Sequence, residues 1–235
     1  MWQGAREDRR GGPEDQPTCQ DAIVVDYDRT LTDDNLIAYG PALGTLRMLQ
    51  AMNRMKVIIA TGRSISFMLR EEAVFGFADA IVAEDGAVIW VPKAAIIERI
   101  GDGSQTRDAL RSSGIPFEEG DVVVSVDRGR EVDVKRAIRR EGLQVELQYN
   151  QNSLMILPEG IDKAAGVKVA LRLMGIPSAR LVCIGDGEND LSLFKIAKLR
   201  VATEGSVQVL KDQSDVICHG PNAVGVTRFL EGLLQ

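Results

Sequence analysis

Two aspartates, Asp26 and Asp28, are spaced two residues apart near the start of the chain and directly follow the apolar run 22–25. Such a run is typical of a short strand buried on both faces. Side chains on a strand repeat every second residue, so the two carboxylates are expected to point the same way. Two acids at the end of a buried strand are costly unless a cation or a reaction uses them. The alternatives are an acidic loop and an aspartate that caps the next helix.

A second acidic segment, 185–190, follows the apolar run 181–184 and reads Gly-Asp-Gly-Glu-Asn-Asp. Its residues Asp186, Asn189 and Asp190 offer hard oxygen ligands of the kind that suit Mg²⁺. The alternative is an acidic loop that caps the helix after it.

Two further stretches have the properties of anion sites. Thr61 and Gly62 follow the apolar run 57–60 and open a predicted helix, whose free N–H groups and dipole favour an anion. Asp162 suits a helix N-cap, which places Lys163 in the first helical turn. A lysine is unfavourable there unless a bound phosphate reverses the sign of the interaction. A plain N-cap and an exposed lysine are the simpler alternatives.

The elements that must position these residues alternate between apolar runs and stretches of helical periodicity. Polar residues or glycine follow each run. This order predicts an α/β fold: a doubly wound, Rossmann-like parallel sheet with helices on both faces. Ligands of such sheets bind beyond the carboxyl ends of the strands, where the acidic segments are expected to meet. The predicted strands are 22–25, 57–60, 80–83, 181–184 and 200–202.

The middle of the chain has a different character, with dense turn residues and closely spaced candidate strands that favour antiparallel pairing. We therefore predict a core domain formed by 21–86 and 159–235, with a smaller α+β cap domain, 87–158, inserted after its third strand. Residues 1–20 mix Gly, Pro, Gln and both signs of charge, which predicts a disordered tail. The candidate elements of the insert are strands at 122–126, 144–149 and 154–157 and helices at 105–112 and 132–141.

Composition narrows the class of function. A net charge of -6 and a pI near 5.0 argue against nucleic acid and anionic membrane surfaces as partners. No apolar run approaches the ~18 residues of a membrane helix and no secretory signal is recognised, so the cytoplasm is the expected location. The sequence leaves both a monomer and a dimer open.

The sulfur and imidazole side chains give no sign of metal or nucleophilic chemistry. Cys19, Cys183 and Cys218 lack metal-ligand spacing, and the last two are expected in the core of a protein from a reducing compartment. The single histidine, His219, lies late in the chain, and the sequence has no nucleophile-elbow motif. Serine–histidine catalysis is therefore an unattractive hypothesis.

Four motifs of the chain, taken in order, resemble those of the haloacid dehalogenase-like superfamily. They are Asp-x-Asp-x-Thr, Thr-Gly-Arg, Asp-Lys and Gly-Asp-Gly-x-Asn-Asp, and the resemblance covers about residues 21–235. The insert is similar to that of the Cof-like branch, which includes archaeal phosphoglycolate phosphatases and sugar-phosphate phosphatases. Two residues depart from the family pattern. Arg29 stands where the family usually has glycine, and Asp85 stands where many members have asparagine.

The resemblance implies roles for the motif residues. Asp26 would be the nucleophile that forms an aspartyl-phosphate, and Asp28 would act as general acid and then as general base. Mg²⁺ would be held by the Asp26 carboxylate, the Asp28 backbone carbonyl and Asp186, with Asp190 bound directly or through water. Asn189 would orient Asp186 or the phosphate. The residues expected to bind the phosphate are Thr61, Gly62, Lys163 and Asn189.

The resemblance thus implies a Mg²⁺-dependent phosphatase of carbohydrate metabolism whose substrate is a small phosphomonoester, phosphoglycolate or a sugar phosphate. Two alternatives share the aspartyl-phosphate: a phosphosugar mutase, which returns the phosphoryl group, and a receiver-like signalling module. A receiver's phosphoacceptor normally lies mid-chain in a domain about half this length, whereas the acidic pair opens this fold. Within the insert, we expect Asn152 and Ser153 to contact the leaving group.

Overall fold

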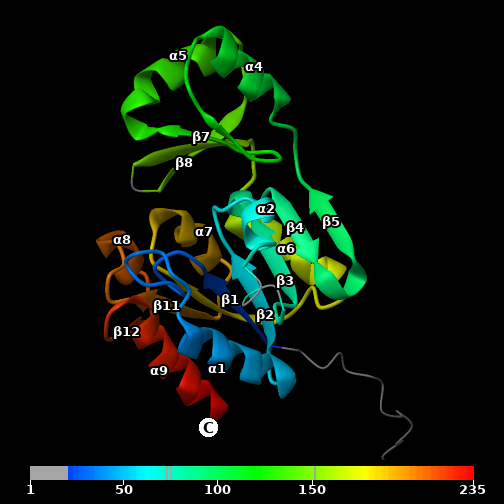
Figure 1. Ribbon diagram of the computed structural model, residues 1–235, viewed down its shortest axis with the longest axis vertical. Coiled ribbons are helices and arrows are strands. Elements are labelled where there is room, and N and C mark those ends of the chain that lie inside the picture. Colours follow the sequence, from blue (N-terminus) through cyan, green and yellow to red (C-terminus); the bar gives the residue numbers. More distant parts are fainter. Residues whose placement is uncertain (1–20, 72–73, 75, 151) are drawn as a thin grey trace, which may run out of the picture.

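The computed structural model describes residues 21–71, 74, 76–150 and 152–235. The predicted disordered tail, 1–20, lies outside the described residues, and Cys19 lies outside with it. The described chain forms a larger part and a smaller part stacked on it (Figure 1). Within these ranges, no helix combines the length and the apolar character needed to cross a membrane.

The larger part is built on a sheet that has eight strands within the described ranges, with β1 among its central strands. β1 pairs in parallel with β10 on one side and with β2 on the other, so Asp26 lies level with Ala60 at the end of β2. The apolar runs form strands here because nearly all of their side chains are buried between two layers of helix. From edge to edge the strands are β12 (Val216–Cys218), β11 (Leu199–Thr203), β10 (Arg180–Gly185), β1 (Asp21–Asp26), β2 (Lys56–Ala60), β3 (Ala80–Ala83), β4 (Val88–Val91) and β5 (Ile96–Arg99).

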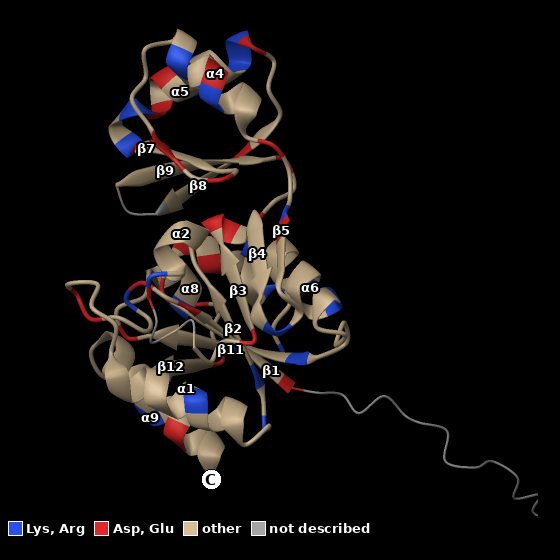
Figure 2. Cartoon of the chain, turned by 45° about the vertical axis from the view of Figure 1, so that its right-hand side comes forward, with Lys and Arg blue, Asp and Glu red and all other residues tan. Residues whose placement is uncertain are grey.

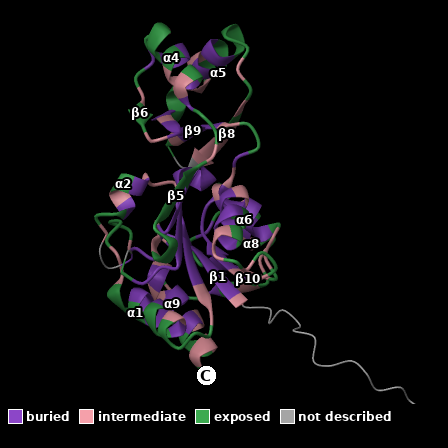
Figure 3. Cartoon of the chain, turned by 90° about the vertical axis from the view of Figure 1, so that its right-hand side faces the viewer, coloured by how far each residue is buried: buried purple, intermediate pink, exposed green. Residues whose placement is uncertain are grey.

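Helices cover both faces of this sheet, and its buried strands are visible in Figure 3. Ile23 and Val25 of β1 belong to the core cluster on the side of α1 and α9, whereas the alternate residues Ala22 and Val24 belong to the cluster on the side of α6. The predicted α/β, doubly wound fold is confirmed. The helices of this part are α1 (Gly40–Ala51), α2 (Ile65–Met68), α6 (Lys163–Leu173), α7 (Leu191–Phe194), α8 (Gln208–Lys211) and α9 (Asn222–Leu234).

The chain after β3 turns back onto the larger sheet. β4 pairs antiparallel with β3, and β5 pairs antiparallel with β4. The side chains of β4 are buried against the larger core. The change of sheet therefore comes after Arg99, and the predicted boundary at residue 87 does not coincide with it. A three-residue helical turn, Pro92–Ala94, joins these two strands.

The smaller part, which we call the cap, packs two helices against an antiparallel sheet of four described strands. Leu110 and Val134 of the helices contact the same apolar cluster as Val124 and Ile156 of the strands. Figure 2 shows charged residues interspersed along both helices, whose other faces are apolar. The elements are α4 (Ser104–Ser112), β6 (Glu118–Glu119), β7 (Val124–Asp127), the turn Arg128–Arg130, α5 (Glu131–Arg140), β8 (Val145–Asn150) and β9 (Ser153–Pro158).

A buried carboxylate joins the larger part to the cap. Glu84 lies in the turn after β3, Glu84–Gly86, and its side chain accepts hydrogen bonds from the backbone N–H groups of Asp121, Val122 and Val123 at 2.7, 2.9 and 2.9 Å. A Cβ at Gly120 would lie 2.6 Å from the carboxyl carbon of Glu84, so glycine is needed for this approach. Three N–H donors on one ionised acceptor fix the cap segment next to the end of β3.

We expect Glu84→Gln to loosen this junction. The glutamine amide oxygen accepts fewer and weaker hydrogen bonds than a carboxylate. The NH₂ group of the glutamine would also face backbone N–H groups, which are donors themselves. Hydrogen exchange of the amides of residues 121–123 should therefore become faster by about ten- to a hundredfold. The control is Glu98→Gln on the exposed strand β5. Unchanged exchange in Glu84→Gln would contradict this account of the junction.

Candidate active site

Three parallel strands and one helix deliver the predicted site residues to one edge of the larger sheet. Asp26 ends β1, Thr61 follows β2, Asp186 follows β10, and Lys163 is the first residue of α6. These positions meet because β1 lies between β2 and β10, and the strands run in the same direction. Asp162 caps α6 by accepting a hydrogen bond from the N–H of Ala165 at 2.8 Å, as predicted.

The Lys163 ammonium group links two acids that are far apart in sequence. Its Nζ donates to Oδ1 of Asp26 at 2.6 Å and to Oδ1 of Asp190 at 2.7 Å. The Lys163 side chain is 0% exposed, and both acids are buried. Burial alone would lower the pKa of Lys163, but the carboxylates of Asp190 and Asp26 outweigh it and hold that pKa above its usual value. Lys163 is therefore a charged group within the core, and not the exposed lysine of the simpler alternative.

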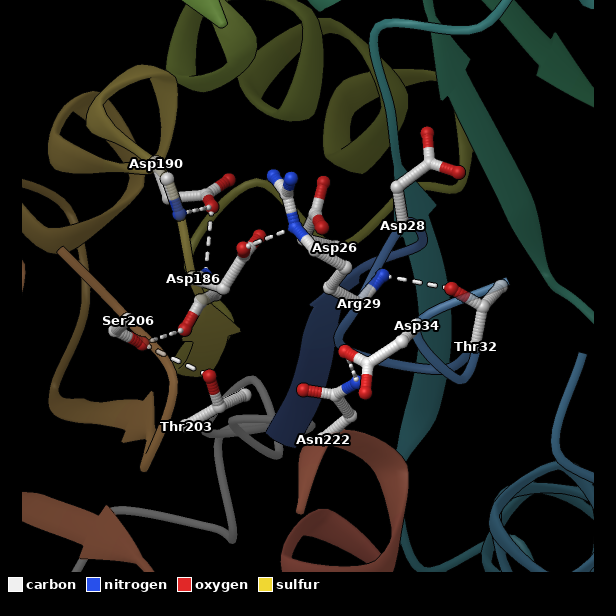
Figure 4. A network of polar contacts seen from close by, with 12 residues as sticks. Asp26, Asp28, Arg29, Thr32, Asp34, Asp186, Asp190, Thr203, Ser206 and Asn222 are labelled. Atoms are coloured by element: carbon white, nitrogen blue, oxygen red, sulfur yellow. Dashed lines mark hydrogen bonds and ion pairs between the residues drawn. The ribbon is translucent and has the colours of Figure 1, made fainter. Parts of the chain in front are cut away.

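Asp190 is held in place by the loop that carries it. Its Oδ2 accepts hydrogen bonds from the N–H groups of Asp186 and Gly187, both at 3.0 Å. A Cβ at Gly185 would lie 2.5 Å from the Asp190 carboxyl group, so the strand must end in glycine there. Ser206 donates to the carbonyl oxygen of Gly185 at 3.1 Å, which joins the end of β10 to the loop after β11 (Figure 4). The turn Glu188–Asp190 then leads into α7.

Asp26, Asp186 and Asp190 form a cluster that fits a divalent cation. One carboxylate oxygen from each lies within 4.8 Å of the others, and all three residues are buried. An oxygen-only set of ionised ligands is the donor chemistry that Mg²⁺ prefers. Both oxygens of Asp190 already accept hydrogen bonds, whereas Oδ2 of Asp26 accepts none among the described residues.

Burial and mutual repulsion raise the pKa values of these acids. Burial is the largest cause for Asp26, whose pKa lies well above its usual range, and Asp190 and Asp186 add to it while Lys163 opposes it. Burial together with Asp190 raises the pKa of Asp186 to about 6, although Arg29 acts in the other direction. A bound divalent cation would favour the ionised forms of both acids.

Asp28 lies outside this cluster and is paired with an arginine. Nε of Arg63 donates to Oδ2 of Asp28 at 2.8 Å, and an Nη donates to Oδ1 at 2.9 Å. The Arg63 guanidinium also lies over the ring of Phe67, 4.7 Å from its centroid. Arg63 is the third residue of the Thr-Gly-Arg motif, so two predicted motifs meet in this bidentate ion pair.

Arg29 follows Asp28 in the loop after β1, and its side chain contacts the acid cluster. Its backbone is left-handed, with φ of 57°, and its Nε donates to Oδ2 of Asp186 at 2.9 Å. Figure 4 shows the Arg29 side chain extending toward Asp186 beside Asp26. The residue that departs from the family pattern thus contacts a predicted metal ligand directly.

The remaining predicted phosphate ligands surround a second unusual acid, Asp85. Asp85 is fully buried and left-handed, with φ of 49°, and its Oδ1 accepts a hydrogen bond from Asn189 at 3.0 Å. Its Oδ2 is buried without a hydrogen-bond partner in the described chain, and burial raises its pKa. Asn189 therefore contacts Asp85 and not Asp186. Thr61 is fully buried, and Gly62 leaves room for Asp85 Oδ2, which would lie 3.4 Å from a Cβ there.

A cavity of about 440 Å³ opens between the site and the cap. Asp28, Arg29 and Gly62 line it from below, and Ser125 and Ser153 line it from the cap. Of the two insert residues expected near the leaving group, Ser153 lines this cavity, whereas Asn152 lines a different one on the cap. The cavity is large enough for a small phosphate ester.

Known proteins share both the sequence pattern and the fold. The haloacid dehalogenase-like hydrolase family matches residues 121–230. The chain is 28% identical to phosphoglycolate phosphatase 2 of Saccharolobus solfataricus, over 91% of this chain and 92% of that protein. It is also 28% identical to the phosphoglycolate phosphatase of Archaeoglobus fulgidus, over 91% and 98%. A haloacid dehalogenase-like hydrolase from Bacteroides thetaiotaomicron has the same fold, with a TM-score of 0.73 and 21% identity, over 91% of this chain and 99% of that one. The chain is therefore similar to haloacid dehalogenase-like hydrolases in both sequence and fold.

Sequence reasoning named the acids and the lysine but missed two of their partners and one contact to the cap. Neither the Arg29–Asp186 pair nor the Arg63–Asp28 pair was predicted, although both arginines lie inside the recognised motifs. The contact of Glu84 with the cap was missed as well, and the only signal was a buried acid directly after a strand. Charged residues at the ends of buried strands are the pattern that points to such partners.

We expect Lys163→Met to destabilise the protein by about 3–5 kcal/mol in EDTA, because three buried carboxylates lose their shared cation. Methionine keeps most of the side-chain volume, so the loss of stability would come from the removed charge and not from a cavity. Urea unfolding followed by circular dichroism measures it, and added Mg²⁺ should restore part of the stability. The matched control is Lys168→Met, on an exposed position of the same helix. Equal stability of the two variants would contradict the assignment of Lys163 as the shared counter-ion.

A pH series tests the raised pKa of Asp186. Because that pKa is about 6 in the folded state, above its usual 3.8, folding takes up a proton between these values. The resulting stability is present below about pH 4 and is lost as pH rises through about 6. In EDTA, the free energy of unfolding of the wild type minus that of Asp186→Asn should therefore fall by roughly 2 to 3 kcal/mol from pH 4 to pH 7. A rise over this range would show that the sign is wrong.

Proposed function

We propose that this protein is a Mg²⁺-dependent phosphatase that cleaves a small phosphomonoester, phosphoglycolate or a sugar phosphate, through an aspartyl-phosphate on Asp26. The observation that carries the proposal is the buried contact of Lys163 with both Asp26 and Asp190, next to Asp186. A carboxylate that attacks phosphorus must approach a phosphate group of the same charge. The Lys163 ammonium group supplies fixed positive charge beside the Asp26 carboxylate, which reduces this repulsion. Relatives named phosphoglycolate phosphatase support the same reaction class.

Asp26 is suited to the role of nucleophile. It ends a strand whose backbone is fixed by pairing on both sides, so its carboxylate has little freedom. Lys163 occupies Oδ1 of Asp26, whereas Oδ2 accepts no hydrogen bond among the described residues and is available for attack. The lysine thus orients the carboxylate and leaves one oxygen for the substrate.

Asp26, Asp186 and Asp190 would hold the Mg²⁺ ion, together with the backbone carbonyl of Asp28. When bound, the ion supplies positive charge that offsets the repulsion between carboxylate and phosphate and the charge that develops on the phosphoryl oxygens. Thr61, Gly62, Lys163 and Asn189 are the residues that we propose for the phosphate itself. The Lys163 ammonium group already contacts Asp26, and Thr61 and Gly62 directly follow Ala60, which lies level with Asp26.

Asp28 would protonate the departing alkoxide and then deprotonate the water that hydrolyses the aspartyl-phosphate. Arg63 currently occupies both oxygens of Asp28. One of these two hydrogen bonds must open before Asp28 reaches the ester oxygen, and the cavity beside both residues leaves room for that movement. Arg63 would thus hold Asp28 between the two proton transfers.

Phosphate release from phosphoglycolate and from an aryl phosphate tests the proposed reaction. We expect EDTA to abolish turnover and Mg²⁺ to restore it, because the carboxylate cluster repels a phosphate on its own. Asp26→Asn should lower kcat by at least about a thousandfold, since an amide is a poor nucleophile. Asp108→Asn, at an exposed position of the cap helix α4, is the control and should keep wild-type turnover.

Two results would overturn the proposal. The first is turnover that Asp26→Asn leaves unchanged. The second is a wild type that releases no phosphate from any small phosphomonoester in the presence of Mg²⁺.

A further inference from the structure

Hydrogen bonds within the loop after β1 fix the backbone at Arg29. Its backbone N–H donates to Oγ1 of Thr32 at 2.7 Å, and the Leu31 N–H donates to the Tyr27 carbonyl oxygen at 2.9 Å. The left-handed backbone of Arg29 costs energy for any residue other than glycine. A bulky cation in that conformation points to a use for its side chain at the site.

The Arg29 guanidinium is only partly used by the protein. Its Nε donates to Asp186, and its two terminal nitrogens have no hydrogen-bond partner among the described residues. The side chain is 21% exposed and borders two cavities, the one of about 440 Å³ under the cap and another of about 240 Å³. An arginine presents its donors as a planar fork that matches a carboxylate or a phosphate. The unused part of this fork faces the space where a substrate would enter.

Two other arginines line the larger cavity but are placed differently. Arg63 is bound by Asp28 through two hydrogen bonds and lies against Phe67. Arg70 lies at an exposed position of the cavity wall. Of these three, Arg29 directly follows Asp28, contacts Asp186, and has terminal nitrogens without a hydrogen-bond partner among the described residues. It is therefore the cation best placed to contact a short substrate bound beside Asp26.

We propose that Arg29 binds a carboxylate on the leaving group, and so selects phosphate esters of short hydroxy acids over neutral alcohol esters. This inference rests on the proposed phosphatase function. In such a substrate only one carbon separates the ester oxygen from the carboxylate, so the carboxylate must lie close to the phosphorus. Arg29 contacts Asp186 beside Asp26 (Figure 4), so its guanidinium is placed to meet a carboxylate at that short distance.

Charge also favours this assignment. Without substrate, Asp186 is the partner of Arg29. When a divalent cation takes up the charge of Asp186, the guanidinium is left beside a cavity with a weaker partner. A second negative group on the substrate would satisfy it, and a hydroxyl group would do so less well. Arg29 then distinguishes the two kinds of ester by the charge of the group that it meets.

The test compares two substrates that differ only at this group: phosphoglycolate and 2-hydroxyethyl phosphate, in which a CH₂OH replaces the carboxylate. The measured quantity is the ratio of their kcat/KM values with saturating Mg²⁺. We expect the wild type to prefer phosphoglycolate and Arg29→Met to lower that ratio by about ten- to a hundredfold. Arg29→Lys, which keeps the charge but not the fork, should retain part of the preference. Arg70→Met removes the same charge from the same cavity and should change the ratio far less.

Each outcome decides between the alternatives. A fall of both kcat/KM values by the same factor in Arg29→Met would mean that Arg29 serves the acid cluster only, and would overturn the inference. An equal change of the ratio in Arg70→Met would do so too, because it would show a general field and not a contact. A wild type that hydrolyses sugar phosphates but does not prefer phosphoglycolate would sink the inference and keep the phosphatase. A wild type without phosphatase activity would remove the proposed function itself. Thermal unfolding of each variant checks that it folds.

Discussion

One buried ammonium group makes the site possible. Lys163 contacts Asp26 and Asp190 within 2.7 Å while itself fully buried, and a buried ion of this kind costs several kcal/mol unless its partners are placed well. The charges do not balance, because three clustered acids face Lys163 and a single N–H of Arg29. Burial raises the pKa values of Asp26 and Asp186, and the neighbouring acids raise them further, so the cluster is suited to a further cation.

The position of that lysine depends on the turn Glu84–Gly86. A Cβ at Gly86 would lie 2.0 Å from the carbonyl oxygen of Asp162, and one at Gly166 would lie 2.6 Å from the Cα of Gly86. The two glycines let the first turn of α6 pack against this turn, which places Lys163 at the end of β1. Glu84 of the same turn binds the backbone of the cap. A single short segment therefore sets both the position of the lysine charge beside Asp26 and the position of the cavity wall.

The sequence predicts the strands and the site acids well, because burial on both faces leaves long apolar runs and because their ends carry the polar residues. It predicts contacts between side chain and backbone poorly. The partners of Glu84 are three N–H groups, which have no residue type to recognise. The predicted boundary at 87 and the change of sheet after Arg99 differ for a related reason. The residues of β4 are as apolar as a central strand, but pairing with β3, and not composition, decides which sheet they join.

The two residues that depart from the family pattern, Arg29 and Asp85, together change where charge lies in the site but not its total. Arg29 adds a cation where glycine is usual, and Asp85 adds an acid where asparagine is usual, so their formal charges cancel. Arg29 lies at Asp186 beside the cavity, whereas Asp85 contacts Asn189 and feels the field of Lys163. Positive charge is thereby moved toward the side where a leaving group would lie, and negative charge toward the lysine. Burial raises the pKa of Asp85, whereas the charge of Lys163 and the hydrogen bond from Asn189 act in the opposite direction, so the added acid is stabilised in part by the same lysine that holds Asp26.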